Sequence, residues 1–166
     1  EEWEDDLIVF PVDGYGDPES IRSIIRNQKP DILWFMTDPR FYEWLWSMEN
    51  EIRPLMPMVY YHVWDNFPAP KFNEAYYSSN DFVATISKVT DEIVKTVSPN
   101  VAREYVPHAV NKKWFKKLDQ DRILKSRQKI FGNLLLDDDG NEKMVFFWNN
   151  RNARRKQSGS LAWWFK

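Results

Sequence analysis

Short apolar runs alternate with helix-like segments over the first two thirds of the sequence, and this alternation limits the fold more than any other feature. Each run has five or six residues, which suits a strand and is too short for a helix. The segments between the runs carry apolar residues at helical spacing, as at Ile21, Ile24 and Ile25. We therefore predict an α/β fold in which a parallel, Rossmann-like sheet carries helices on both faces. The runs expected to be strands are residues 7–12, 32–36, 58–63, 82–86 and 101–106.

Glycine, proline and capping residues mark the turns between these elements. Gly14 and Gly16 form a turn between the first expected strand and a helix that starts near Pro18. A phosphate could meet helix amides there, but the turn lacks the third glycine of a dinucleotide-binding motif, so we interpret it as structural. Asp38 is expected to cap a helix after the second strand, and Ser87 a helix after the fourth.

Charge divides the sequence into an acidic and a basic part. Residues 1–111 hold nine Lys and Arg against 19 Asp and Glu, a net charge of −10. Residues 112–166 hold 14 against six, a net charge of +8, which gives the formal total of −2. Such a division favours two structural units, the second suited to an anion. A strand expected at residues 144–148 and a helix expected to start near Leu161 cannot complete a domain, so we expect the sequence to be a fragment.

Composition excludes several classes of site. The chain has no cysteine, which excludes disulfides, thiolate zinc sites and cysteine nucleophiles. Its only histidines are His62 and His108, so a histidine-rich metal site is excluded as well and we expect no metal. No apolar run approaches the roughly 20 residues that span a bilayer, and the acidic first residues indicate no signal peptide. This composition is compatible with a reducing cytosol, and we expect a cytoplasmic protein.

Nine tryptophans are unusual for a chain of 166 residues. Aromatic side chains bury large areas, so most of them are expected in the core. Trp44 and Trp46 cannot both face inward on one helix, and neither can Trp163 and Trp164. Some aromatic surface is therefore expected to be exposed or to contact a partner.

Three polar residues at or just beyond the ends of expected strands form the first candidate site. His62 stands at the end of the third strand, with Asp65 just beyond it, and Asp38 follows the second strand. Ligands of open parallel sheets bind outside the carboxyl ends of the strands. A histidine there can bond a sugar hydroxyl or stabilise charge at a reacting carbon, or it can satisfy its own loop instead. For Asp38, helix capping is the favoured interpretation over ligand binding.

A cationic stretch, residues 151–156, forms the second candidate site. It contains Arg151, Arg154, Arg155 and Lys156 at the point where an expected strand leads into a helix. Guanidinium, ammonium and helix-terminal amides could converge there on one anion, and a diphosphate suits them better than a single carboxylate does. The alternatives are a solvated basic loop and a nucleic-acid contact, which would need a continuous basic face.

Several segments, taken in order, resemble the GT-B glycosyltransferases, most closely the retaining, family-4-like group. Residues 29–33 (Lys-Pro-Asp-Ile-Leu) resemble the entry to a strand of the N-terminal domain, and residues 57–62 resemble a strand whose final histidine borders the sugar site. Residues 147–156 resemble the strand and Arg…Lys loop that open the nucleotide-binding domain. The other similar segments are residues 81–87 (Asp-Phe-Val-Ala-Thr-Ile-Ser) and residues 105–111, followed by Trp114 and Phe115.

The resemblance implies a GT-B fold and the transfer of a sugar from a nucleoside-diphosphate sugar to an acceptor, without a metal or a further cofactor. Arg151 and Lys156 would neutralise the donor diphosphate. His62 would contact the transferred sugar or line the acceptor side. Asp38 and Asp65 are the further acceptor-side candidates because of their positions beyond the ends of expected strands. The implied catalytic residues are thus His62, Arg151 and Lys156.

The resemblance also implies a division into domains. Residues 1–111 would be a partial N-terminal, acceptor-side domain, residues 112–142 a basic connector, and residues 143–166 the start of the nucleotide-sugar-binding domain. Ala109 replaces the glycine usual in the family and Asn111 its aspartate, so the interdomain loop is expected to differ in shape. In these enzymes a carboxylate motif that holds the donor would follow the last residue given, so we expect this chain by itself to bind nucleotide weakly or not at all, and not to turn over.

A different class of function stays open beside the enzyme. The alternative is a non-catalytic α/β module that binds a partner, or another copy of itself, through exposed aromatic residues. Among partners we expect a nucleotide-sugar donor and an acceptor and no nucleic acid, and we leave open a peripheral membrane contact and a homo-oligomer.

Overall fold

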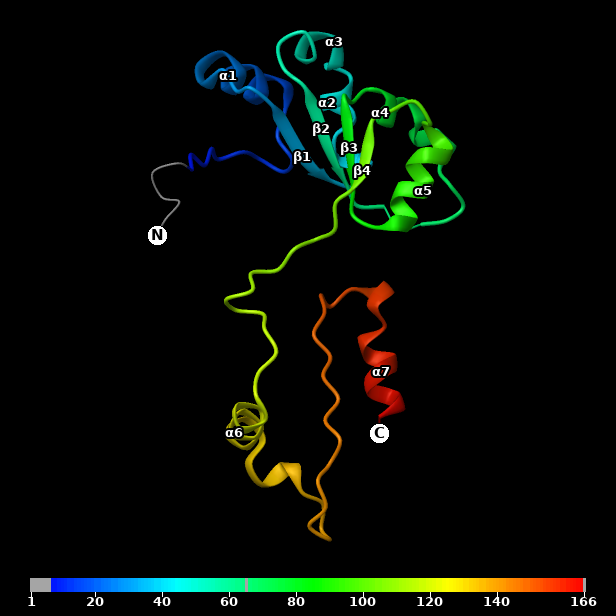
Figure 1. The fold of residues 1–166 in the computed structure, drawn as a ribbon. Coiled ribbons are helices and arrows are strands. Elements are labelled where there is room, and N and C mark those ends of the chain that lie inside the picture. The colour runs from blue at the N-terminus through cyan, green and yellow to red at the C-terminus, as the bar shows by residue number, and fades with distance from the viewer. Residues whose placement is uncertain (1–6, 65, 166) are drawn as a thin grey trace. The chain divides into compact units, whose positions relative to one another are not determined.

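The computed structural model describes residues 7–64 and 66–165. The chain divides into two compact units, Glu1–Ala109 and Val110–Lys166 (Figure 1). Asp65, one of the predicted site residues, lies outside the described residues. Among the described residues, none of the helices combines the length and the apolar character needed to cross a membrane.

A four-stranded sheet lies at the centre of the first unit (Figure 1). All its strands are parallel and lie side by side in chain order, β1-β2-β3-β4. The predicted α/β fold with a parallel sheet is therefore confirmed, whereas the GT-B type stays a prediction. The strands are β1 Leu33–Thr37, β2 Met58–His62, β3 Phe82–Thr85 and β4 Arg103–Tyr105.

The helices of this unit pack on one face of the sheet, so the prediction of helices on both faces is wrong. Phe35, Tyr60 and Val83 point to this face from neighbouring strands and share one core with residues of the helices, including Ile21 and Ile25 of the first one. When parallel strands follow in sequential order, right-handed crossovers carry every connection to the same side. The helices are α1 Pro18–Gln28, α2 Glu43–Trp46, α3 Glu49–Ile52, α4 Glu74–Ser78 and α5 Lys88–Val97, with the 3-10 turns η1 Pro39–Phe41 and η2 Lys71–Asn73.

The opposite face of the sheet carries none of these five helices. It presents Trp34 and Met36 of β1, which are 53% and 50% exposed. The Trp34 ring stacks on Tyr61 of β2, and the Tyr61 hydroxyl donates to the Val106 carbonyl at 2.9 Å. β1 is therefore covered on one side only.

Local sequence explains how the longer helices begin and end. Asp17 caps α1 by accepting hydrogen bonds from two amides of the first turn, and Lys29 ends this helix in the left-handed conformation, with φ of 47°. Ser87 caps α5 as predicted, because its hydroxyl accepts from the Thr90 amide at 3.1 Å.

Two predicted elements of the first unit are wrong. Residues 7–12 form no strand; they pair with no neighbouring strand in the described part of the chain and are exposed. The single helix expected after Asp38 is divided into η1, α2 and α3. At the break between α2 and α3 the Ser47 hydroxyl donates to the Trp44 carbonyl at 2.6 Å, and such a bond competes with helical hydrogen bonding.

The second unit differs from the prediction in its strand and in the start of its last helix. The strand predicted at residues 144–148 is not formed: no strand among the described residues pairs with this segment, and it is exposed. The helix predicted near Leu161 starts earlier, at Ser158, and Trp163 and Trp164 are both exposed. The regular elements described here are α6 Gln120–Phe131, α7 Ser158–Trp164 and the 3-10 turns η3 Gly132–Leu135 and η4 Arg154–Lys156.

Candidate functional site

The carboxyl ends of β1 and β2 bring two predicted site residues to one edge of the sheet. Asp38 directly follows β1. His62 is the last residue of β2 and pairs in register with Thr37, the last residue of β1. Both residues therefore lie at the edge where parallel α/β sheets bind ligands.

The His62 side chain points into the core, and both of its ring nitrogens have partners. It is 0% exposed. Its Nδ1 atom lies 2.9 Å from the Tyr60 hydroxyl oxygen, and its Nε2 atom lies 2.8 Å from that of Tyr77. The Tyr60 hydroxyl donates to the Thr37 carbonyl at 2.5 Å, and the Asn73 amide donates to the Tyr77 oxygen at 3.2 Å. A continuous chain of hydrogen bonds thus runs from Asn73 through His62 to Thr37.

The donors and acceptors in this chain of hydrogen bonds determine which imidazole nitrogen carries the proton. Because Tyr60 donates its one proton to the Thr37 carbonyl, its oxygen must accept from Nδ1–H of His62. Nε2 is then the unprotonated nitrogen and accepts from the Tyr77 hydroxyl. Burial lowers the pKa of His62 to about 3, against the opposing effect of the Asp38 carboxylate. The imidazole is therefore neutral near pH 7 and has no free nitrogen to offer a ligand.

The same chain of hydrogen bonds also holds the backbone at the carboxyl end of β1. Thr37 has a φ of 152°, a value that β-branched residues rarely adopt, and its carbonyl is held by the Tyr60 hydroxyl. Holding this carbonyl also orients the next residue, Asp38. His62 thus holds the Thr37 carbonyl through Tyr60, and its contact with a sugar stays a prediction.

Asp38 is engaged by its neighbour Arg40. Its carboxylate accepts from the Arg40 backbone amide at 3.1 Å and from Nη2 of the Arg40 guanidinium at 2.8 Å, and so caps η1. The hydrogen-bonded guanidinium lowers the pKa of Asp38, so the carboxylate stays ionised. In the described part of the chain, no three His, Asp or Glu side chains are grouped so that they could hold a metal ion.

The glycine turn before α1 carries no anion site. Gly14 and Gly16 have φ values of 57° and 81°, which glycine adopts readily, and the Gly16 amide donates to the Asp13 carbonyl at 3.0 Å. The Asp17 carboxylate already accepts from the first amides of α1, where a phosphate would have to bind. This geometry supports the structural interpretation of the turn.

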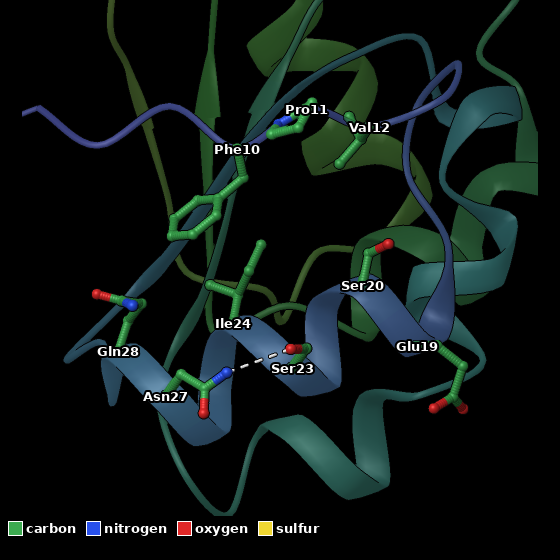
Figure 2. Close-up of a pocket in the computed structure, with 9 residues that line it drawn as sticks. All are labelled: Phe10, Pro11, Val12, Glu19, Ser20, Ser23, Ile24, Asn27 and Gln28. Atoms are coloured by element: carbon green, nitrogen blue, oxygen red, sulfur yellow. Dashed lines mark hydrogen bonds between the residues drawn. The ribbon is translucent and has the colours of Figure 1, made fainter.

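A hollow of about 380 Å³ lies between residues 10–12 and α1 (Figure 2). Phe10 and Ile24 point into it, and along its wall the Asn27 amide donates to the Ser23 hydroxyl at 3.3 Å (Figure 2). Its lining includes the carboxylate of Glu19 and neither lysine nor arginine. It therefore does not suit a diphosphate.

The predicted diphosphate-binding residues belong to the second unit, whereas Asp38 and His62 belong to the first. Lys156 is the last residue of η4, and Arg151 lies in the loop before it. Arg151, Arg154 and Arg155 are exposed, and Lys156 is half-buried. Within residues 7–64 and 66–165, none of these four cations forms an ion pair with a carboxylate. Their positive charge is available to an external anion.

Tyr60 and Tyr77 bond to His62, and Asn73 bonds to Tyr77; none of these three residues was predicted from the sequence. Tyr60 precedes His62 by two residues on a strand, so the alternation of strand faces could have placed both side chains on one face. Asn73 and Tyr77 are four residues apart, a spacing that indicates contact on a helical turn. No pattern joins this pair to His62, because only the packing of α4 on the sheet brings them together.

No family model matches the sequence, and neither does a curated protein or a solved structure. The functional interpretation therefore depends on the residues of this chain and on their geometry.

Proposed function

We propose that this chain acts in a GT-B glycosyltransferase of the retaining, family-4-like group, which transfers a sugar from a nucleoside-diphosphate sugar to an acceptor. The observation that carries the proposal is the group of four cations at Arg151, Arg154, Arg155 and Lys156, which lack carboxylate partners within the described residues. The segments that resemble the family follow one another in the family's order, and most of them lie in the parallel α/β unit. This order supports the proposal further.

In this proposal Arg151 and Lys156 stabilise the charge that develops on the departing diphosphate. The bond between the anomeric carbon and the phosphate oxygen breaks, and its electron pair stays on the phosphate. The acceptor oxygen bonds to the anomeric carbon on the same face, and the departing phosphate takes the acceptor's proton. Fixed cations opposite the developing charge lower the barrier to this step. An arginine adds two parallel hydrogen bonds, and a lysine adds a compact point charge.

The acceptor-side residues of the proposal belong to the first unit. Asp38 offers ionised oxygens at the carboxyl edge of the sheet, where a sugar hydroxyl can donate to them. His62 holds the Thr37 carbonyl through Tyr60 and so keeps this edge in place. Asp65 is kept as a predicted acceptor-side residue because it follows closely on His62 in the sequence.

A titration with nucleoside diphosphates tests the proposal. NMR spectra of the labelled chain are recorded with UDP, GDP, UMP and inorganic phosphate, since this method detects weak binding. We expect UDP or GDP to bind more tightly than UMP and phosphate, with shifts centred on residues 151–156. Arg151→Gln and Lys156→Gln should each weaken diphosphate binding at least about tenfold, the lower limit for a lost charge-assisted hydrogen bond.

A cation elsewhere in the same unit provides the control. Lys116 is exposed, and Lys116→Gln changes the net charge by the same amount as Lys156→Gln. Equal effects of the two variants, or equal binding of UDP and phosphate, would contradict a specific diphosphate site.

The alternative of a non-catalytic binding module has its own supporting observation. Trp163, Trp164 and Phe165 are exposed, and a surface of this kind favours association. Under this alternative Trp164→Ser would abolish partner binding or self-association and leave any nucleotide-dependent shift unchanged. A nucleic-acid partner would instead bind residues 151–156 with an affinity that falls steeply as salt is raised.

A further inference from the structure

The outer edge of β1 pairs with no other strand among residues 7–64 and 66–165. Within this part of the chain β1 lies at the edge of the sheet and has β2 as its neighbour. The Leu33 amide donates toward β2, to the Pro57 carbonyl at 3.0 Å. Because alternate residues of a strand direct their backbone polar groups to opposite sides, Trp34 and Met36 direct theirs to the outer side. A row of backbone amide and carbonyl groups without strand partners can form hydrogen bonds with another strand.

The two edges of the sheet differ in how they are protected. Proteins commonly protect an edge strand with charges, prolines or short length. β4 has these features: it has three residues, two of them are Arg103 and Glu104, and Pro107 follows closely. β1 reads Leu-Trp-Phe-Met-Thr and carries neither a charge nor a proline. The sequence thus protects one edge of the sheet and leaves the other free to pair.

The apolar segment at residues 7–12 does not pair with this edge in the described part of the chain. Residues 10–12 lie against α1, where Phe10 points into the hollow beside Ile24 (Figure 2). No hydrogen bond joins residues 7–12 to β1 in the described part of the chain. Trp34 is held in place by stacking on Tyr61, with ring centroids 5.5 Å apart. The edge and its aromatic side chain are therefore preformed for a partner.

We propose that the outer edge of β1 pairs with the β1 strand of a second copy of this chain, antiparallel and about a twofold axis at Phe35. In this register Trp34 of each copy lies opposite Met36 of the other, on the face without helices. The residues with outward backbone groups then exchange hydrogen bonds, and two sulfur–aromatic contacts form. β1 carries no charge, so no like charges face each other within the paired strands. A single β1 pair is a small interface, and the association is expected to be weak.

This proposal does not depend on the glycosyltransferase assignment. It uses residues of the first unit only, and diphosphate binding by residues 151–156 has no part in it. Either proposal can therefore fail while the other stands.

Disulfide trapping tests the register. The chain has no cysteine, so every cross-link reports an introduced residue. Trp34→Cys and Met36→Cys are prepared separately, one of them with an affinity tag, and oxidised alone and as a mixture. The mixture should cross-link, because directly opposite residues lie about 5.5 Å apart and within disulfide reach. Each variant alone should not, because its two copies are diagonal neighbours about 7–8 Å apart.

The other edge provides the matched control. Glu104→Cys mixed with Met36→Cys should not cross-link, and circular dichroism should show that all variants are folded, since both β1 positions lie outside the core. Cross-linking of Trp34→Cys alone as well as the mixture would contradict the antiparallel register. Absence of cross-linking in the mixture would overturn the proposal.

Sedimentation of cysteine-free variants gives an independent readout. Met36→Lys places a charge on the pairing edge and should weaken self-association at least about tenfold, whereas Glu104→Lys on β4 should leave it unchanged. Self-association that persists in Met36→Lys and is lost in Trp164→Ser would assign the interface to the exposed aromatics of the second unit, against this proposal.

Discussion

The Tyr77 hydroxyl of α4 donates a hydrogen bond of 2.8 Å to Nε2 of His62 at the carboxyl end of β2. This bond joins a helix to the sheet edge and fixes the imidazole as a neutral group. Several properties of the first unit should depend on it.

Tyr77→Phe should lower the free energy of unfolding by about 1–3 kcal/mol, because it leaves a buried nitrogen acceptor without a donor. Urea denaturation measures the change. Tyr76→Phe is the control: it removes the hydroxyl of the neighbouring tyrosine, for which the described structure shows no side-chain hydrogen bond. An equal loss in both variants would contradict the importance of this bond.

Stability should fall as the pH is lowered below about 6.5. The unfolded His62 takes up a proton near its ordinary pKa, whereas burial lowers the pKa of the folded His62 to about 3. Between these values the unfolded state binds one more proton, so the stabilising contribution is complete above pH 6.5 and is lost on the way down to about pH 3. The slope of the unfolding free energy should approach about 1.4 kcal/mol per pH unit from this group.

His62→Gln removes the titrating group and tests the origin of this slope. Urea denaturation of both proteins is measured between about pH 4.5 and 7, in steps of roughly half a pH unit. The carboxylates contribute equally to both proteins, so the difference between the two curves belongs to His62. Parallel curves would show that folding does not lower the pKa of His62.

Asp17→Ala should destabilise the first unit by about 0.5–2 kcal/mol, because two amides and one hydroxyl of the first turn of α1 lose their acceptor. Thermal unfolding followed by circular dichroism measures the loss. Asp13→Ala serves as the control, since the turn uses only the backbone carbonyl of Asp13. Greater damage from Asp13→Ala than from Asp17→Ala would contradict the assigned cap.

Gly16→Ala should lower the stability of the fold, whereas Gly159→Ala should favour its helix. Gly16 has a φ of 81°, and alanine in that conformation costs about 1–2 kcal/mol, although its Cβ would lie at an ordinary 3.5 Å from the Trp44 ring. Gly159 lies within α7 in open space, where alanine favours the helix by up to about 1 kcal/mol. Thermal unfolding checks the first change and far-UV circular dichroism the second. Stabilisation by Gly16→Ala would show that the turn adopts another conformation.

The candidate site was predictable only in part. Asp38 and His62 were placed correctly at the carboxyl ends of neighbouring strands, because the boundaries of β1 and β2 are visible in the apolar runs. The direction of the His62 side chain was not predictable, since its partner Tyr77 lies on α4 and reaches it only after the helix packs on the sheet. Arg151 and Lys156 were expected to follow a strand at residues 144–148 that is not formed, and their role toward a diphosphate remains a proposal.

The sequence by itself determined the elements that depend on near neighbours in the chain. The Asp17 and Ser87 caps, the helices α1 and α5 and the parallel strands from β1 to β4 all follow from contacts or patterns within a few residues. Only the tertiary structure decided which face of the sheet the helices cover, and that residues 7–12 and 144–148 stay outside any sheet. A strand needs a partner to satisfy its backbone, and whether that partner is within reach depends on distant parts of the chain.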